Sequence, residues 1–120
     1  MKNVTLVMGA STNPNRYSNI AIKRLIDKKI PVAALGVRKG TVFGTVIDNE
    51  KQEYKNIDTV TLYLNPKRQE EYYDYIIGLS PRRVIFNPGT ENDDFVQLLK
   101  DNNIESEIAC TLVLLSVDQY

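Results

Sequence analysis

Short apolar runs alternate along the first part of the chain with a segment of helical spacing. Val4–Met8 and Val32–Leu35 are apolar runs of strand length, and each is followed by a glycine. Between them the apolar side chains recur every three or four positions, as on one face of a helix: Tyr17, Ile20, Ala21, Ile22, Leu25 and Ile26. The pattern predicts a strand, a helix and a second strand.

The same alternation returns after residue 56. Residues 57–64 are rich in β-branched and aromatic side chains, which favours a third strand. Asn65 and Pro66 are the residue types of a helix cap and a first helical position, and that helix should end before Pro81. Its apolar positions are Tyr72, Tyr73, Ile76, Ile77 and Leu79.

The last third of the chain predicts two more strands and two helices. The strands are expected at residues 84–86 and 108–110, and a helix between them would use Phe95, Leu98 and Leu99. Residues 111–115 suit a terminal helical turn. Only residues 37–56 lack a regular pattern, and they are compatible with a small hairpin or an irregular loop around Gly40 and Gly44.

This order of elements predicts one α/β domain spanning residues 1–120. We expect a Rossmann-like three-layer fold with a five-stranded parallel sheet in the order 3-2-1-4-5. Strands 1 and 4 would then lie side by side, and their helices would leave toward opposite faces. Such a divergence opens a ligand-binding crevice at the carboxyl ends of the strands.

Composition narrows the classes of function. The 120 residues carry 15 Lys and Arg and 15 Asp and Glu, and this zero net charge disfavours general binding to nucleic acids or anionic membranes. No apolar run approaches the roughly 20 residues that span a bilayer. The apolar run at the amino terminus is too short, and too often interrupted by polar residues, to be a signal peptide. A cytoplasmic location is therefore expected.

Histidine is absent, and Cys110 is the only cysteine. The chain therefore lacks the usual general base for a Ser or Cys nucleophile and the commonest zinc ligand. We expect no metal site and no catalysis by this chain unaided. Cys110 is expected to be a buried structural thiol, since one cysteine cannot form an internal disulfide.

The loop after the first strand has the features of a phosphate site. Gly9 permits a close backbone approach, and Ser11 and Thr12 offer hydroxyl groups. Free amides at the start of the next helix, near Tyr17 and Ser18, would face an anion. The alternative is an ordinary strand-to-helix turn, because the loop is neither a Gly-x-Gly-x-x-Gly nor a Walker sequence.

The loop after the second strand separates nucleotide cofactors. NAD-binding domains usually place an acid here for the ribose hydroxyls, whereas this chain has Val37, Arg38 and Lys39. The two cations suit a phosphate on the adenosine ribose, as in coenzyme A or NADP. A solvated basic loop is the alternative. Asn87, Pro88 and Gly89 follow the fourth strand at the expected crevice, although turn chemistry alone explains them too.

Taken in order, these motifs resemble a known family. Residues 9–11, 16–19, 63–66 and 87–89, with Cys110 near the end, are similar to the small stand-alone CoA-binding proteins and to the amino-terminal CoA-binding domain of the succinyl-CoA synthetase alpha subunit. The resemblance covers essentially the whole chain. The first loop differs in detail from the synthetase pattern. The ligase chemistry does not carry over, because the synthetases use a phosphoryl-relaying histidine and a beta subunit.

The resemblance implies that CoA or an acyl-CoA is the partner. The first loop would surround the CoA phosphates, the second loop would approach the adenine and the 3′-phosphate, residues 63–65 would flank the adenine or the pantetheine, and residues 87–89 would line the floor. The expected cofactor-binding residues are Gly9, Ala10, Ser11, Thr12, Arg16, Tyr17, Ser18, Val37, Arg38, Lys39, Tyr63, Leu64, Asn65, Asn87, Pro88 and Gly89. The alternatives are an NADP-binding redox or sensor domain and a protein-interaction module without a ligand.

Overall fold

Seven strands form one sheet in the computed structural model, which describes residues 2–120. The strands are β1 (Val4–Met8), β2 (Val32–Leu35), β3 (Gly40–Val42), β4 (Thr45–Asp48), β5 (Ile57–Leu62), β6 (Arg83–Phe86) and β7 (Glu105–Ile108). The helices are α1 (Tyr17–Asp27), α2 (Pro66–Gln69), the 3₁₀ helix η1 (Glu70–Tyr72), α3 (Tyr73–Leu79), α4 (Asp93–Asp101) and α5 (Thr111–Ser116). The α/β class, the Rossmann-like architecture and the mostly parallel sheet are confirmed.

The expected five-stranded order 3-2-1-4-5 is wrong. The observed order is β3-β4-β2-β1-β5-β6-β7, so the first strand has the third expected strand, β5, as its neighbour and not the fourth, β6. The physical reason is the irregular segment after β2. Its strand β4 pairs in parallel with β2 and occupies that edge, and β5 therefore pairs with the other edge of β1.

The β3–β4 hairpin is the only antiparallel pair in the sheet over residues 2–120. Its turn contains Phe43 and Gly44, both with positive φ, which is typical of a tight hairpin connection. From β4 the chain returns to β5 without a helix. Tyr54 fixes this connection, because its hydroxyl donates a hydrogen bond to the Asp48 carboxylate at 2.5 Å and lies 3.2 Å from the Ala34 carbonyl oxygen.

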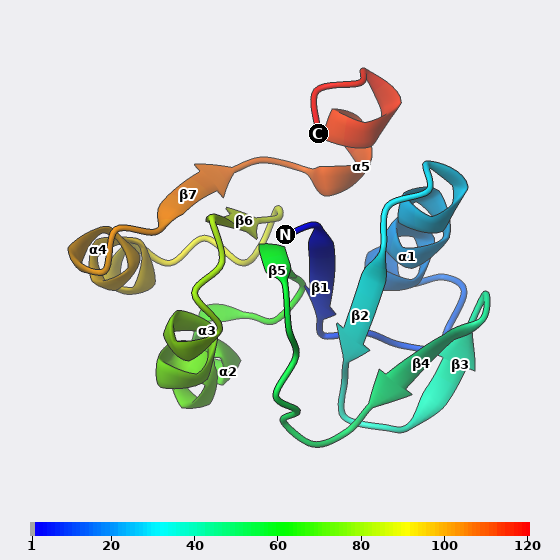
Figure 1. Cartoon of the computed structure of the whole chain (residues 1–120), viewed down its shortest axis with the longest axis horizontal. Helices are drawn as coiled ribbons and strands as arrows, with labels where there is room; N and C mark the ends of the chain where they lie inside the picture. The colour runs from blue at the N-terminus through cyan, green and yellow to red at the C-terminus, as the bar shows by residue number, and fades with distance from the viewer. Residues whose placement is uncertain (1) are drawn as a thin grey trace.

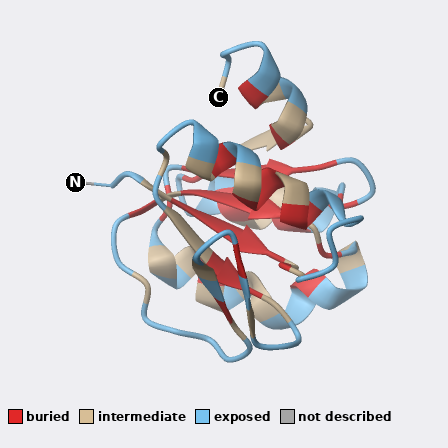
Figure 2. Cartoon of the chain, turned by 90° about the vertical axis from the view of Figure 1, so that its right-hand side faces the viewer, coloured by how far each residue is buried: buried red, intermediate tan, exposed pale blue. Residues whose placement is uncertain are grey.

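Helices cover both faces of the sheet. Figure 1 shows α1 and α5 grouped on one side of the molecule and α2, α3 and α4 on the other. The central strands β1, β5 and β6 are mostly buried between them, and the red ribbons in Figure 2 mark these buried positions. β5 lies between β1 and β6, and even its polar Thr59 and Thr61 are fully buried.

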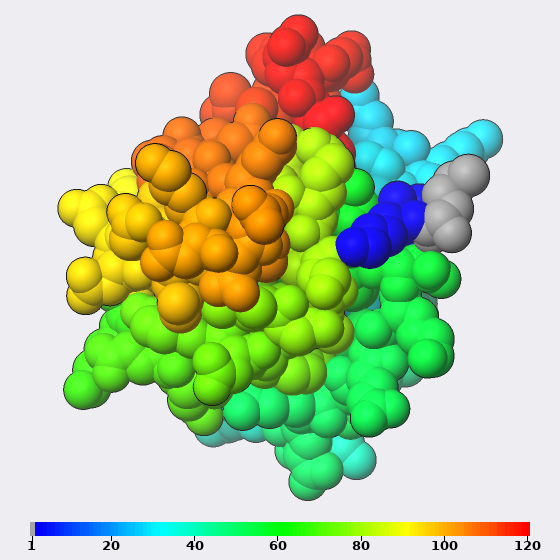
Figure 3. Space-filling view, turned by 60° about the vertical axis from the view of Figure 1, so that its left-hand side comes forward, coloured from blue at the N-terminus to red at the C-terminus, as the bar shows by residue number. Residues whose placement is uncertain are grey.

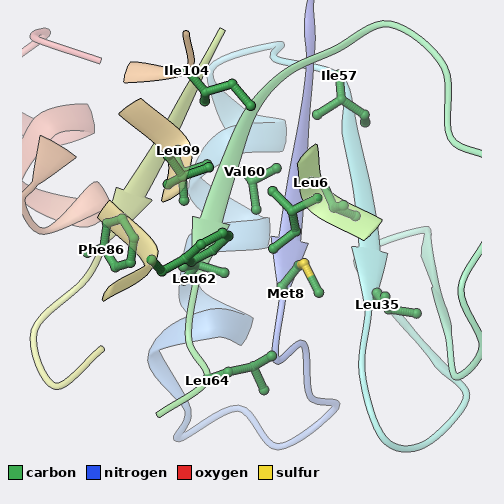
Figure 4. Close-up of a cluster of buried hydrophobic side chains, with 13 residues drawn as sticks. Leu6, Met8, Leu35, Ile57, Val60, Leu62, Leu64, Phe86, Leu99 and Ile104 are labelled. Atoms are coloured by element: carbon green, nitrogen blue, oxygen red, sulfur yellow. The ribbon is translucent and has the colours of Figure 1, made fainter. Parts of the chain in front are cut away.

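The larger core lies between the sheet and helices α3 and α4. Figure 4 shows side chains from neighbouring strands, such as Leu6, Val60 and Phe86, converging on this layer. The smaller core lies on the opposite face, where α1 and α5 pack on β1, β2 and the hairpin: Val7, Ile22, Leu25, Ala34, Ile47 and Leu115. No helix of residues 2–120 is both long and apolar enough to cross a membrane.

The last strand lies earlier than expected. β7 spans Glu105–Ile108, whereas the sequence favoured residues 108–110. Its charged side chains gave no apolar strand pattern in the sequence. Such side chains are tolerated on an edge strand. Glu107 on β7 forms an ion pair with the buried Arg83 of β6. Figure 3 shows β7 in orange at the surface, below the red carboxyl-terminal residues.

The carboxyl-terminal segment packs back onto the sheet. The Tyr120 ring lies 4.6 Å from the guanidinium carbon of Arg83, and its hydroxyl hydrogen-bonds to Thr5. Lys28, the residue directly after α1, holds the same segment through an ion pair with Asp118 at 2.7 Å. These contacts cover the polar part of the sheet face that α1 and α5 leave open.

Candidate functional site

A cleft of about 760 Å³ lies at the carboxyl ends of the central parallel strands. It forms where the chain leaves neighbouring strands in opposite directions: β1 leads to α1 on one face, and β5 leads to α2 on the other. The switch point is therefore between β1 and β5, and not between the first and fourth expected strands. All the expected cofactor-binding residues line this cleft except Lys39 and Asn87.

Two glycines let the backbones of three loops meet beneath the cleft. A Cβ on Gly9 would lie 2.9 Å from the carbonyl carbon and oxygen of Tyr63, and Gly9 has a φ of +87°. A Cβ on Gly36 would lie 2.2 Å from the carbonyl oxygen of Ala10. Only glycine fits either contact, so the loops after β1, β2 and β5 form one continuous backbone surface.

The loop after β1 is ordered by its own polar groups. Ser11 Oγ accepts a hydrogen bond from the Asn13 amide at 3.0 Å, and the buried Asn19 donates its Nδ2 to the Ser11 carbonyl at 3.0 Å. Asn19 is the first residue of the helix whose amide donates a helical hydrogen bond, to the carbonyl of Arg16 at 3.1 Å. The amides of Tyr17 and Ser18 precede it, and they are the unsatisfied donors that a helix start offers to an anion.

The cleft is positively charged. Arg16, Arg38 and Arg68 line it from the loops after β1, β2 and β5, and no Asp or Glu is among its lining residues. Arg68 was not expected from the sequence. The sequence could nevertheless have indicated it. Asn65 and Pro66 predict a helix start, and Arg68 lies in the first turn of that helix.

Two exposed apolar side chains border the basic part of the cleft. Tyr17 is 71% exposed and Val37 is 67% exposed, and both line the cleft. A planar base can stack on such surfaces, since aromatic and aliphatic faces bind bases without regard to their edges. Tyr17 and Val37 therefore offer the surface on which a base could stack.

A buried amide clamps the loops after β5 and β6 together. Gln69 is fully buried, and its Nε2 donates to the Leu64 carbonyl and to the Thr90 carbonyl, both at 2.8 Å. Its Oε1 accepts from Asn92 at 2.9 Å. Asn65 Oδ1 caps the same helix by accepting from the Arg68 amide at 2.9 Å, which confirms the expected Asn-Pro helix start.

Replacing Gln69 by Leu should therefore loosen one wall of the cleft. The substitution removes the Gln69 partner of the Leu64 and Thr90 carbonyls and one of the two hydrogen bonds of Asn92 Nδ2, which should lower the free energy of unfolding by about 1–3 kcal/mol. Urea denaturation measures this loss. Gln97→Leu on the exposed face of α4 is the matched control and should stay within about 0.5 kcal/mol of wild type. Equal stability of the two variants would contradict the clamp.

The two expected residues outside the cleft lining have different surroundings. Asn87 is buried and supports the site from below, since its Nδ2 donates to Thr61 Oγ1 and its Oδ1 accepts from the Thr111 amide at 2.8 Å. It therefore ties α5 to the sheet. Lys39 is exposed and is not among the residues that line the cleft.

Cys110 and Tyr63 lie close to this support. Cys110 is half-buried and is the N-cap residue of α5, where its backbone turns the chain into the helix. Burial raises the pKa of Tyr63 to about 12, so its hydroxyl stays neutral at physiological pH.

A second hollow of about 490 Å³ lies at the opposite, amino edge of the sheet. Ser80, Arg82, Asn103 and Glu105 line it. None of the expected cofactor-binding residues takes part in it, and it has no helix start facing inward. The carboxyl-edge cleft is therefore the candidate site.

Comparisons with known proteins agree with this fold. The chain resembles the crystal structure of an uncharacterized protein, with 44% identity, a TM-score of 0.96 and coverage of 100% of this chain and 99% of the other. A hypothetical protein from Pyrococcus horikoshii OT3 shares 25% identity with a TM-score of 0.82, over 93% of this chain and 80% of the other. The PH1109 protein redesigned for binding shares the fold at 21% identity, with a TM-score of 0.85 over 98% of this chain and 83% of the other.

No curated protein matches the sequence. A family model does: the model of the CoA binding domain matches residues 3–116, which is nearly the whole chain. The matched region contains every loop of the cleft. The chain therefore belongs to the CoA binding domain family.

Proposed function

We propose that the carboxyl-edge cleft binds coenzyme A or an acyl-CoA, with the loop after β1 around the pyrophosphate and the loop after β2 at the adenosine. The single observation that carries the proposal is the composition of this cleft. It combines a helix start, a glycine-rich backbone surface and arginines, with no acid among the lining residues. A polyanionic nucleotide is the class of ligand that such a lining favours.

The adenosine end is assigned to the second loop. Arg38 offers a charged fork for the 3′-phosphate, and Val37 with Tyr17 offers apolar surface for the base. The pyrophosphate then lies over Ser11 and the free amides of Tyr17 and Ser18. Arg16, which directly precedes these amides, adds a cation on the same side.

Binding without catalysis is the form of function that the lining supports. Its residues include no Asp, Glu, Cys or His, and the pKa of Tyr63 is raised, so the cleft offers no group that exchanges protons readily near neutral pH. The chain thus acts as a carrier or sensor of the cofactor in this proposal. In this proposal the CoA-bound form acts through its conformation or through the proteins that bind it.

Calorimetric titration with CoA, NADP and NAD tests the proposal. CoA should bind most tightly. Its ribose phosphate is at the 3′ position, adjacent to the ring carbon that carries the pyrophosphate arm, and the first loop holds that pyrophosphate. At a free concentration about 100 times its Kd, CoA should stabilise the fold by about 2.7 kcal/mol, seen as an increase in Tm. Tighter binding of NADP would identify a different cofactor, and no binding of any of the three would favour an interaction module.

A further inference from the structure

Arg68 is a third cation in the cleft, in addition to Arg16 and Arg38, to which we assign the phosphates of CoA. It lines the cleft from the first turn of α2, on the far side of β1 from Arg38. Its neighbour Lys67 pairs with Glu70 at 3.7 Å, whereas no salt bridge within residues 2–120 involves Arg68. The guanidinium is thus available to a ligand.

The position of Arg68 along the cleft sets which part of a ligand it meets. The loops follow the strand order β2, β1, β5 and β6. With the 3′-phosphate at Arg38 and the pyrophosphate over the loop after β1, the pantetheine arm continues toward the loops after β5 and β6. That arm is uncharged, so CoA itself brings no anion to this end.

The backbone that carries Arg68 is held firmly. Asn65 caps its amide at 2.9 Å, and the next residue, Gln69, bonds to the carbonyls of Leu64 and Thr90. A charge presented from a fixed element discriminates between ligands better than one on a free loop. The location, the absence of an internal partner and the rigid support all point to recognition of a second anion.

We infer that the preferred ligand is an acyl-CoA whose acyl group ends in a negative charge, and that Arg68 binds that charge as a specificity-determining residue. The inference rests on the proposed CoA-binding function and names its substrate class. A terminal carboxylate matches the planar guanidinium, which can bind both oxygens at once. A thioester with an apolar acyl end offers Arg68 no partner.

The test compares succinyl-CoA with butyryl-CoA, which differ at the acyl end by a carboxylate in place of a methyl group. Calorimetric Kd values are measured for both thioesters and for free CoA with wild type, Arg68→Gln and the control Lys67→Gln. Lys67→Gln removes the same charge from the adjacent position of α2, but Lys67 does not line the cleft. Urea denaturation of each variant checks that the fold is retained.

Wild type and Lys67→Gln should bind succinyl-CoA about tenfold to a hundredfold more tightly than butyryl-CoA. Arg68→Gln should lose this preference and keep its affinity for free CoA within about threefold. Equal affinity of wild type for the two thioesters would overturn the inference while leaving CoA binding intact. So would an Arg68→Gln loss that is as large for free CoA, which would assign Arg68 to a phosphate. Failure of all three ligands to bind wild type would contradict the proposed function itself.

Discussion

Gly9→Ala should be the most damaging single substitution at the cleft. The new Cβ would lie 2.9 Å from the Tyr63 backbone, and alanine would have to adopt a φ of +87°. Left-handed backbone costs roughly 1–2 kcal/mol, and overpacking adds about 1–3 kcal/mol, so the free energy of unfolding should fall by roughly 2–5 kcal/mol. The affinity for CoA should fall at least about tenfold, because the loop after β1 must move away from β5.

Gly44→Ala separates backbone strain from the close contact. Gly44 also has a positive φ, +84°, but a Cβ there would meet no atom within 4 Å, and it lies at the hairpin turn outside the cleft lining. This control should lose only about 1–2 kcal/mol and bind CoA as wild type does. Urea denaturation and calorimetry measure both variants. Identical losses would show that the packing of Gly9 on Tyr63 does not shape the site.

Arg38→Ala should distinguish CoA from dephospho-CoA. If Arg38 binds the 3′-phosphate, its removal eliminates a charge-assisted hydrogen bond of about 1.5–3 kcal/mol, which lowers the affinity for CoA about tenfold to a hundredfold. Dephospho-CoA lacks that phosphate, so its affinity should change little. Competition calorimetry with the two ligands gives both ratios.

Lys39→Ala is the matched control for Arg38. Both residues are exposed cations of the same loop, but only Arg38 lines the cleft. The Lys39 variant should therefore retain most of its affinity for CoA, apart from a small salt-dependent loss. An equal loss of CoA and dephospho-CoA in Arg38→Ala, or a larger loss in Lys39→Ala, would contradict the assignment of the ribose phosphate to Arg38.

The elements of the fold follow from the sequence better than their order does. The alternating strand and helix patterns and the Asn65 cap are local signals, and they place most elements correctly. Strand order depends on which edge of β2 is occupied, and that depends on the hairpin within residues 37–56. Short strands with mixed polarity, such as Gly40–Val42, give no pattern that determines their pairing partner.

The edge of the sheet at which the cleft lies was predictable, because it depends on the loops after parallel strands more than on the order of those strands. Under either order the loops after the parallel strands lie at the carboxyl edge of the sheet. The expected order would have separated Leu64 from Gly9 by the second strand, whereas the observed order places β5, and so Leu64, beside the loop of Gly9. Gln69 could not be recognised in this way. Its role depends on Thr90 lying opposite it across two loops, a contact between residues 21 positions apart in the chain.

A crystal structure of the protein with bound CoA tests the central claim most directly. It should show the pyrophosphate over the loop after β1, near the amides of Tyr17 and Ser18, and the 3′-phosphate against Arg38. The pantetheine arm should pass Asn65 toward Thr90. Density for CoA in the hollow at the amino edge, beside Ser80 and Asn103, with the carboxyl-edge cleft unchanged, would contradict the account.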